Sequence, residues 1–199
     1  MGAVLAGGSG SRLGGVAKGL LEVGGARLID RVGSALDAAC DRVIVVANDP
    51  DAAGWRPGTL VVRDARTGLG AAGGIHAALL AAQGDDARVV AWDLPFVTGD
   101  LLRALREMAA AADAAVCARA GSRWGIEPLC ACYRHSCLAV LERRLDAGDA
   151  RAGAWLDDVR VATLDRVALA RFGDPDVLLM DVDTAEDLAE ARRLAGETS

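Results

Sequence analysis

Short apolar runs alternate with longer segments of helical periodicity along almost the whole chain. Eight runs have the length and composition of buried strands: 3–6, 42–47, 60–62, 88–92, 114–118, 129–133, 159–163 and 177–180. Helical patterns occupy residues 27–39, 71–83, 100–112, 135–147 and 184–194. The last of these opens on Thr184 and has Asp187 three positions later, which is the pattern of a capping box.

This alternation of strands and helices indicates an α/β fold. We expect a single three-layer domain over residues 1–199, in which a mainly parallel sheet carries helices on both faces, as in Rossmann-like proteins. Ligands of such sheets bind at the carboxyl ends of the strands, so a site is expected in the loops that follow them. Residues 151–175 are less regular and form a candidate flap or dimer element.

A glycine-dense loop follows the first predicted strand, with the sequence LAGGSGSRLGGVAK over residues 5–18. Backbone N–H groups of such a loop can converge on an anion, and the cations Arg12 and Lys18 can neutralise a polyphosphate from two directions. Only three residues separate Gly14 from Lys18 and no hydroxyl follows the lysine, so this is not a Walker A loop. Leu13 also fits poorly to a dinucleotide-binding fingerprint. The loop predicts a nucleotide ligand.

A carboxylate stands at the end of the predicted strand 88–92. Asp93 follows the apolar run directly, and Pro95 prevents the strand from continuing. Carboxylate oxygens suit Mg²⁺, which usually takes one or two carboxylates together with substrate phosphates. Taken alone, Asp93 is more commonly explained as the end of a strand or the cap of the helix around Asp100; together with the glycine loop it favours a metal site.

Two further aspartates lie near the end of the chain, at Asp181 and Asp183. If the strand predicted at 177–180 continues, the alternation places both on one face of its end, where either could complete a magnesium site with Asp93. The alternative is a capped helix start, which accounts for Thr184 and the acids after it but not for the two aspartates before it.

Composition and charge exclude several classes of protein. Hydrophobic residues make up 52% of the chain and the net charge is -6, which disfavours disorder and a nucleic-acid-binding surface. No uninterrupted apolar stretch reaches the roughly 18 residues of a membrane span, and the first strand begins too early for a signal peptide. We therefore expect a cytoplasmic protein, a monomer or weak homo-oligomer, with no nucleic-acid or membrane partner.

The cysteines and the histidine His76 have plain structural interpretations. Five cysteines in a chain without an export signal indicate reduced thiols rather than a disulfide framework. Cys130 and Cys132 lie in an apolar run and no C-x-x-C pair occurs, so we interpret these thiols as core residues rather than zinc ligands. His76 lies on an alanine-rich helix and is interpreted as packed or solvated, not catalytic.

Several of these segments together resemble one family. The loop 5–18 resembles the signature loop of nucleotidyltransferases with a GT-A-like α/β fold, and Asp93-Leu94-Pro95 resembles their D-x-P metal motif. Residues 181–188 resemble the N-x-N-T-P-E-D-L segment of the molybdenum cofactor guanylyltransferases, with aspartates in place of both asparagines. The segment around Asp64 and Gly74 resembles the part of the family that surrounds the nucleoside.

The resemblance implies a fold of the nucleotide-diphospho-sugar transferase type and a magnesium-dependent reaction. In it, GMP passes from GTP to the phosphate of molybdopterin, or of the molybdenum cofactor, and pyrophosphate is released. The implied catalytic residues are Arg12, Lys18 and Asp93. The implied nucleotide-binding residues are Leu5, Ala6, Gly7, Gly8, Ser11, Arg12, Lys18, Asp64, Gly74 and Asp93, and the implied ligands of Mg²⁺ are Asp93, Asp183 and Asp181.

Departures from the family pattern leave alternatives open. Ala17 stands where the family usually has an aspartate, and Val46 stands where guanine-selective relatives have an asparagine, with Asn48 two residues later on the same face. Cytidylyltransferases that act on molybdopterin have the D-x-D-T pattern of Asp181 and Asp183. The alternatives are a cytidylyltransferase or a nucleotidyltransferase with another phosphorylated acceptor, and a nucleotide-binding homologue without catalysis.

Overall fold

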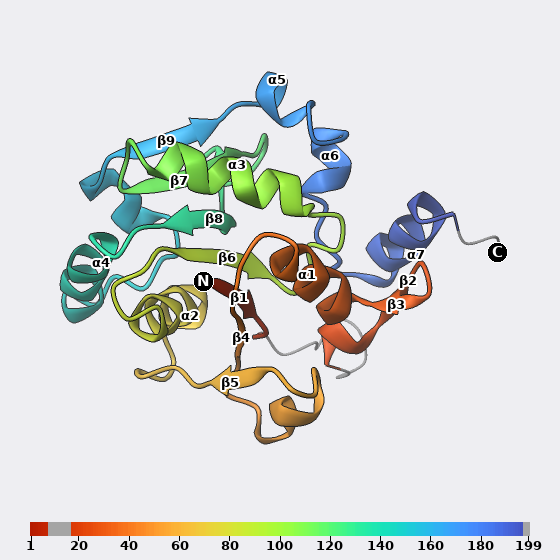
Figure 1. The fold of residues 1–199 in the computed structure, drawn as a ribbon, viewed down its shortest axis with the longest axis horizontal. Coiled ribbons are helices and arrows are strands. Elements are labelled where there is room, and N and C mark those ends of the chain that lie inside the picture. Colours follow the sequence, from red (N-terminus) through yellow and green to blue (C-terminus); the bar gives the residue numbers. More distant parts are fainter. Residues whose placement is uncertain (8–16, 197–199) are drawn as a thin grey trace.

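The computed structural model describes residues 1–7 and 17–196, and its centre is a large β-sheet (Figure 1). In this described part the sheet has seven strands in the order β5-β4-β1-β6-β8-β7-β9. Their bounds are β1 Gly2–Leu5, β4 Val43–Val46, β5 Leu60–Val62, β6 Ala87–Ala91, β7 Ala114–Ala118, β8 Ile126–Tyr133 and β9 Val161–Leu164. Only β8 runs against its neighbours, so the predicted α/β fold with a mainly parallel sheet is confirmed.

The register of the three central strands decides where a site can form. Leu5 at the end of β1 pairs with Val46 at the end of β4 and with Ala91 at the end of β6. The carboxyl ends of these parallel strands are therefore level, and the chain leaves the sheet in three adjacent loops. Such a row of loop starts is where α/β sheets bind ligands.

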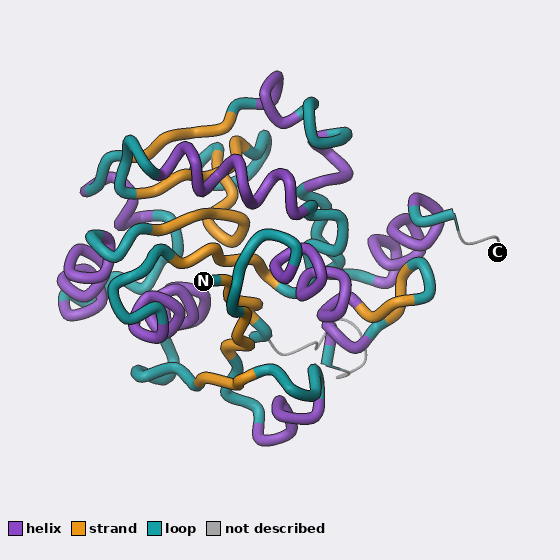
Figure 2. The backbone as a smooth tube through the Cα atoms, viewed as in Figure 1, coloured by secondary structure: helices purple, strands orange, loops and turns teal. Residues whose placement is uncertain are grey.

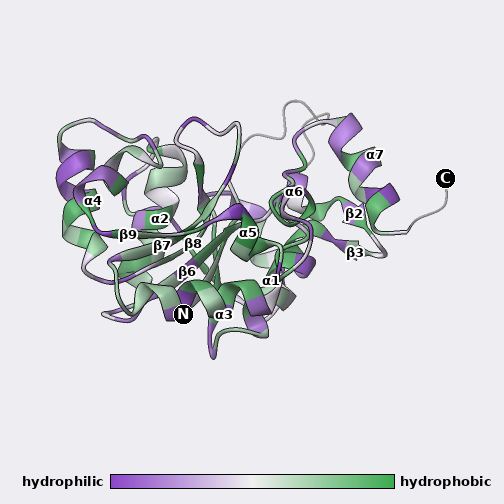
Figure 3. Cartoon of the chain, turned by 90° about the horizontal axis from the view of Figure 1, so that it is seen from above, coloured by the Kyte–Doolittle hydropathy of each residue, from purple (hydrophilic) through white to green (hydrophobic). Residues whose placement is uncertain are grey.

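Helices cover both faces of the sheet, as predicted. Helices α1 (Leu28–Asp37) and α3 (Gly99–Ala109) lie on one face, whereas α2 (Gly70–Ala81) and α4 (Cys137–Asp146) lie on the other. The residues of β1 alternate between the two cores, because Val4 packs with the first pair of helices and Leu5 with the second. Figure 3 shows the apolar sheet between these helices.

A third, smaller core lies at one end of the molecule. A short hairpin of β2 (Glu22–Val23) and β3 (Ala26–Arg27) packs there against α7 (Ala185–Leu194), as Figure 1 shows. Its buried residues are Val23, Leu28, Val182 and Ala191. The sequence pattern did not predict this hairpin, because strands of two residues are too short to show alternation.

The strand predicted at 177–180 is wrong. The chain instead forms a short helix α6 (Pro175–Leu178), in which the Asp174 side chain accepts a hydrogen bond from the Asp176 N–H. An aspartate N-cap followed by proline at the first helical position is a helix-start signal, and it outweighs a short apolar run. Asp181 and Asp183 therefore do not share the face of a strand end; they lie in the segment between α6 and α7, which has no regular secondary structure. Figure 2 distinguishes the loops of the chain from its helices and strands.

The irregular stretch 151–175 contains short elements. A 3-10 turn over Ala154–Asp158 leads into the edge strand β9, and α5 (Arg166–Leu169) follows. Trp155 in the turn is fully buried and its ring lies 5.1 Å from that of Tyr133. This stretch is thus partly built into the core, and its role as a flap or dimer element stays a prediction. In the described part of the chain, no helix combines the length and apolar character that a membrane crossing requires.

Candidate functional site

A cavity of about 440 Å³ opens at the carboxyl ends of β1, β4 and β6. Six of the residues expected to bind a nucleotide line it, which are Leu5, Ala6, Gly7, Asp64, Gly74 and Asp93. A Cβ added to Gly7 would meet no atom within 4 Å, so the backbone at the end of β1 is open to a ligand. A Cβ added to Gly74 would lie 3.4 Å from Leu5, so α2 packs closely against the strand end at this point.

Asn48 and Asp64 are joined on the wall of this cavity. The Asn48 Nδ2 donates to Asp64 Oδ2 at 2.8 Å, and the Asp64 N–H donates to Asn48 Oδ1 at 3.0 Å. Both polar ends of the Asn48 side chain are therefore engaged with Asp64, and Val46 beside them presents only apolar atoms. Asn48 thus holds the Asp64 carboxylate at the wall of the cavity.

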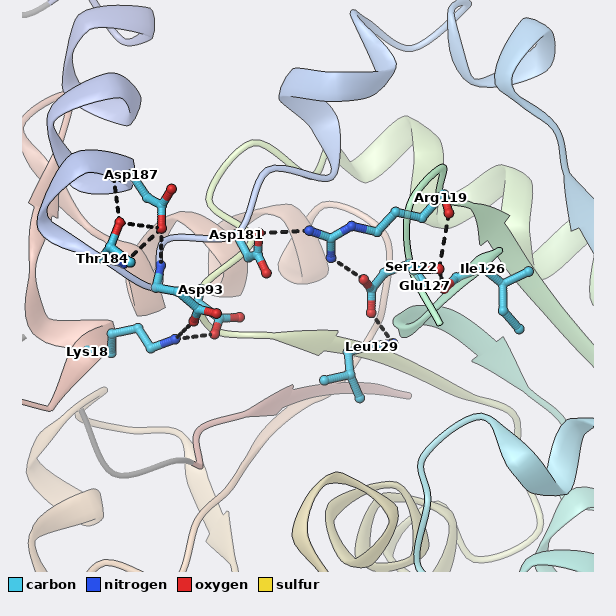
Figure 4. A network of polar contacts seen from close by, with 11 residues as sticks. Lys18, Asp93, Arg119, Ser122, Ile126, Glu127, Leu129, Asp181, Thr184 and Asp187 are labelled. Carbon is cyan, nitrogen blue, oxygen red and sulfur yellow. Dashed lines mark hydrogen bonds and ion pairs between the residues drawn. The ribbon is translucent and has the colours of Figure 1, made fainter. Parts of the chain in front are cut away.

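Lys18 joins two of the predicted carboxylates. Its Nζ lies 2.7 Å from Asp93 Oδ2 and also donates to Asp183 Oδ1, so one ammonium group bridges side chains from the turn after β6 and from the loop before α7 (Figure 4). The lysine is buried, with 11% of its side chain exposed, and Asp93 is also largely buried at 19%. The Val182 N–H donates to the Asp93 backbone oxygen at 2.9 Å, which ties the loop to the end of β6.

The charges of this cluster influence one another. Burial alone lowers the pKa of Lys18, but Asp93 and Asp183 outweigh it and raise the lysine pKa above its ordinary value. Burial raises the pKa of Asp93, and the neighbouring Asp183 adds to this, whereas Lys18 opposes it. An additional cation would therefore be favourable beside these two carboxylates, because in the described part of the chain they share the ammonium of Lys18.

Asp181 takes a different partner. It lies 2.7 Å from Arg119 Nη2 and does not join the contacts between Lys18 and the other two aspartates. Among residues 1–7 and 17–196, no group of three or more acidic, histidine or cysteine side chains is arranged to hold a metal. The structure thus brings Asp93 and Asp183 together and leaves Asp181 apart.

The donor set nevertheless fits Mg²⁺. This ion prefers oxygen ligands and is commonly bound through one or two carboxylates plus the phosphates of the substrate. Asp93 and Asp183 supply two carboxylates within reach of one point, which the Lys18 ammonium marks. Three residues predicted for the site, Gly8, Ser11 and Arg12, lie outside the described residues. The functional roles of all these residues stay predictions.

Some residues of the site carried no recognisable signal in the sequence. Trp92 lines the cavity next to Asp93, stacks on Trp55 at 5.1 Å between ring centroids and covers Gly19. Arg119 forms a partly buried ion pair with Glu127 beside Asp181. An isolated tryptophan or arginine is common in any chain, so only the tertiary structure shows that these side chains lie at the site.

The residues interpreted as structural lie away from this cluster. Cys117, Cys130, Cys132 and Cys137 are buried, and burial raises the pKa of Cys132 and of Cys137 to about 12. His76 is buried, with its Nε2 3.2 Å from Glu142 Oε1 between α2 and α4. None of these five side chains contacts Lys18, Asp93 or Asp183 within the hydrogen bonds and ion pairs of the described part.

Comparisons with known proteins agree on one family. The family described as MobA-like NTP transferase domain matches residues 2–167. A molybdenum cofactor guanylyltransferase from Desulfosudis oleivorans is 34% identical over 202 residues, covering 100% of this chain and 98% of the relative. One from Cereibacter sphaeroides is 35% identical over 197 residues, covering 97% and 95%. A crystal structure of molybdopterin-guanine dinucleotide biosynthesis protein A from Archaeoglobus fulgidus superposes with a TM-score of 0.83 at 27% identity, covering 99% of both chains.

Proposed function

The chain belongs to the MobA-like NTP transferase domain family and is a nucleotidyltransferase, and from this premise we propose that it transfers GMP from GTP to the phosphate of molybdopterin or the molybdenum cofactor. A phosphate oxygen of the acceptor forms a bond to the α-phosphorus of GTP. The bond between the α-phosphorus and the bridging oxygen breaks, and pyrophosphate leaves. The names of the relatives support this choice of donor and acceptor.

The observation that carries the proposal is the Lys18 ammonium between Asp93, which lines the cavity, and Asp183. In the reaction, Lys18 would hold phosphate oxygens and offset the negative charge that develops as pyrophosphate leaves. Asp93 and Asp183 would hold Mg²⁺, which supplies Lewis-acid stabilisation of the same phosphates. The open backbone of Gly7 and the Asp64 carboxylate would contact the nucleoside, and Arg12 would bind the triphosphate from the glycine loop.

We expect pyrophosphate release with GTP, molybdopterin and Mg²⁺ together, and little release when any one is omitted. Asp93→Asn should reduce the rate by about 100-fold or more, the scale on which one electrostatic group acts in a transition state. Asp158→Asn is the matched control, because this exposed carboxylate pairs with Arg144 away from the cavity. Full activity of Asp93→Asn would refute the assignment of the metal site.

The same assay distinguishes a second candidate. Val46 gives the cavity an apolar wall, and Asn48 is engaged with Asp64, so the asparagine expected of guanine-selective relatives has no direct counterpart here. This favours comparing all four nucleoside triphosphates. Release with CTP in place of GTP would identify a cytidylyltransferase, and release with another phosphorylated acceptor would reassign the acceptor.

A further inference from the structure

Arg119 binds two carboxylates from different parts of the chain. It follows β7 directly, and its guanidinium donates to Glu127 on β8 and, at 2.7 Å, to Asp181 in the loop before α7 (Figure 4). The Glu127 side chain is only 8% exposed and Asp181 is 42% exposed. A buried carboxylate needs a charged or hydrogen-bonding partner, so the pair with Glu127 fixes the guanidinium.

The backbone around Arg119 is also held. The Arg119 N–H donates to the Gly125 carbonyl at 2.9 Å, and the Ser122 hydroxyl lies within hydrogen-bonding distance of two carbonyl oxygens, of Arg119 at 3.0 Å and of Ile126 at 2.8 Å. The second oxygen of Glu127 accepts the Leu129 N–H at 2.9 Å. The turn between β7 and β8 thus offers a firm anchor to whatever binds the free side of the guanidinium.

The other side of the Arg119 guanidinium binds Asp181, in the segment 181–183 that also carries Asp183. Residues 181–183 have no regular secondary structure, so their position depends on individual contacts. Arg119 holds Asp181, the buried Val182 donates to the Asp93 backbone, and Asp183 then reaches Lys18. This segment lies beyond the residues 2–167 that match the family.

We propose that Arg119 is a positioning residue: by holding Asp181 against β8, it fixes the segment 181–183 so that Asp183 lies beside Asp93 and can share a divalent cation with it. This inference rests on the proposed function, because it supposes that the two carboxylates serve a metal. Arg119 itself contacts neither Lys18 nor Asp93 in the described structure.

The test measures binding of Mn²⁺ alone by electron paramagnetic resonance, and then kcat and KM for GTP in the pyrophosphate assay. Arg119→Ala should weaken Mn²⁺ binding by about 10-fold, as expected for residues that orient metal ligands, and should lower kcat more than it raises KM. Arg119→Lys retains the charge but loses the planar, preorganised fork of the guanidinium, so an intermediate loss is expected.

Two further variants keep the proposal testable. Asp181→Asn is nearly isosteric, leaves the pair of Arg119 with Glu127 intact, and should also weaken Mn²⁺ binding even if Arg119→Ala folds poorly. Arg144→Ala is the matched control, because Arg144 also contacts two carboxylates, Asp158 at 2.5 Å and Asp149 at 3.6 Å, neither of which belongs to the site. It should bind Mn²⁺ as the wild type does.

The possible outcomes separate the two proposals. If wild-type protein does not bind Mn²⁺, the metal assignment of the proposed function fails. If the wild type binds but Asp181→Asn and folded Arg119→Lys bind equally well, Arg119 is structural only and the positioning role is overturned. Weaker binding in both variants, with the Arg144→Ala control unchanged, supports it.

Discussion

Lys18 depends for its position on the residue that follows it. Gly19 packs directly under the indole ring of Trp92, and a Cβ added there would lie 2.7 Å from Trp92 Cδ2. The ring has little room to move, because Trp92 is 2% exposed and stacks on Trp55. At the scale of single residues, a glycine and a tryptophan therefore constrain the backbone next to Lys18, whose ammonium is held by two aspartates.

Gly19→Ala should therefore displace the chain at Lys18. Overpacking of a tight core costs about 1 to 3 kcal/mol, so a lower free energy of unfolding in urea is expected, together with weaker binding of GTP. Gly54→Ala is the control, because a Cβ at that position meets no atom within 4 Å. Trp92→Leu introduced into the Gly19→Ala variant should restore part of the nucleotide affinity. An unchanged stability and affinity of Gly19→Ala would show that the contact does not position Lys18.

The sequence predicts part of the site at this scale. Asp93 follows a buried strand and Lys18 follows a glycine-dense loop, and both signals are local, so the residues could be picked out from the chain alone. Arg119 and Glu127 could not, and Asp181 is predicted as a metal ligand rather than as the partner of Arg119, because the contact between Arg119 and Asp181 joins positions 62 residues apart. Such contacts leave no periodic pattern in the sequence.

At the scale of elements, the sequence signal for the start of α7 is the clearest, because a complete capping box forms there. The Thr184 side chain accepts the Asp187 N–H at 3.1 Å, and Asp187 Oδ2 accepts the Thr184 N–H at 2.8 Å, which is the capping box predicted from the sequence. The Asp183 N–H also donates to Asp187, at 3.1 Å. The cap therefore holds both the helix and the last residue of the site loop.

Thr184→Ala should cost about 1 kcal/mol in the free energy of unfolding, the usual effect of losing an N-cap. Thr163→Ala, at an exposed position on the edge strand β9, provides the comparison. Since the cap also holds Asp183, Thr184→Ala should weaken Mn²⁺ binding as well as stability. Equal unfolding free energies of wild type and Thr184→Ala in urea would contradict this account.

Protonation of Asp187 gives the same cap a pH dependence. Burial raises the pKa of Asp187, but hydrogen bonds from Thr184 and from the Asp183 N–H outweigh it and lower the pKa below its ordinary value. The stabilisation is therefore present above the ordinary carboxyl pKa of about 3.9 and is lost as the pH falls through the lowered value. The stability difference between wild type and Asp187→Asn should accordingly shrink below about pH 3.9.

Element boundaries show where local signals compete. The Asp174-Pro175 pair favours the start of a helix, whereas the apolar run after it favours a strand. The helix forms because the Asp174 side chain accepts a hydrogen bond from the backbone at the helix start. The hairpin β2–β3 depends on Gly24 and Gly25, whose φ values of 63° and 72° suit a tight two-residue turn. A prediction based only on hydrophobic periodicity therefore misses both the start of α6 and the hairpin β2–β3.

At the scale of the whole molecule, the order of the strands creates the site. β1 lies between β4 and β6, so Gly7, Asn48 and Asp93 follow adjacent strand ends although they are far apart in sequence. Alternation of strands and helices predicts the class of fold, but it does not give this order or the antiparallel β8. The family match ends at residue 167, yet Asp183 reaches Lys18, and we therefore expect the whole chain to act as one nucleotidyltransferase domain.

The most direct test is a crystal structure of the protein with Mg²⁺ and a non-hydrolysable GTP analogue. The account predicts the nucleoside in the cavity between Leu5 and Asp64, the phosphates on Lys18, and the metal on Asp93 and Asp183. A nucleotide bound elsewhere, with neither its phosphates on Lys18 nor its metal on Asp93, would contradict it.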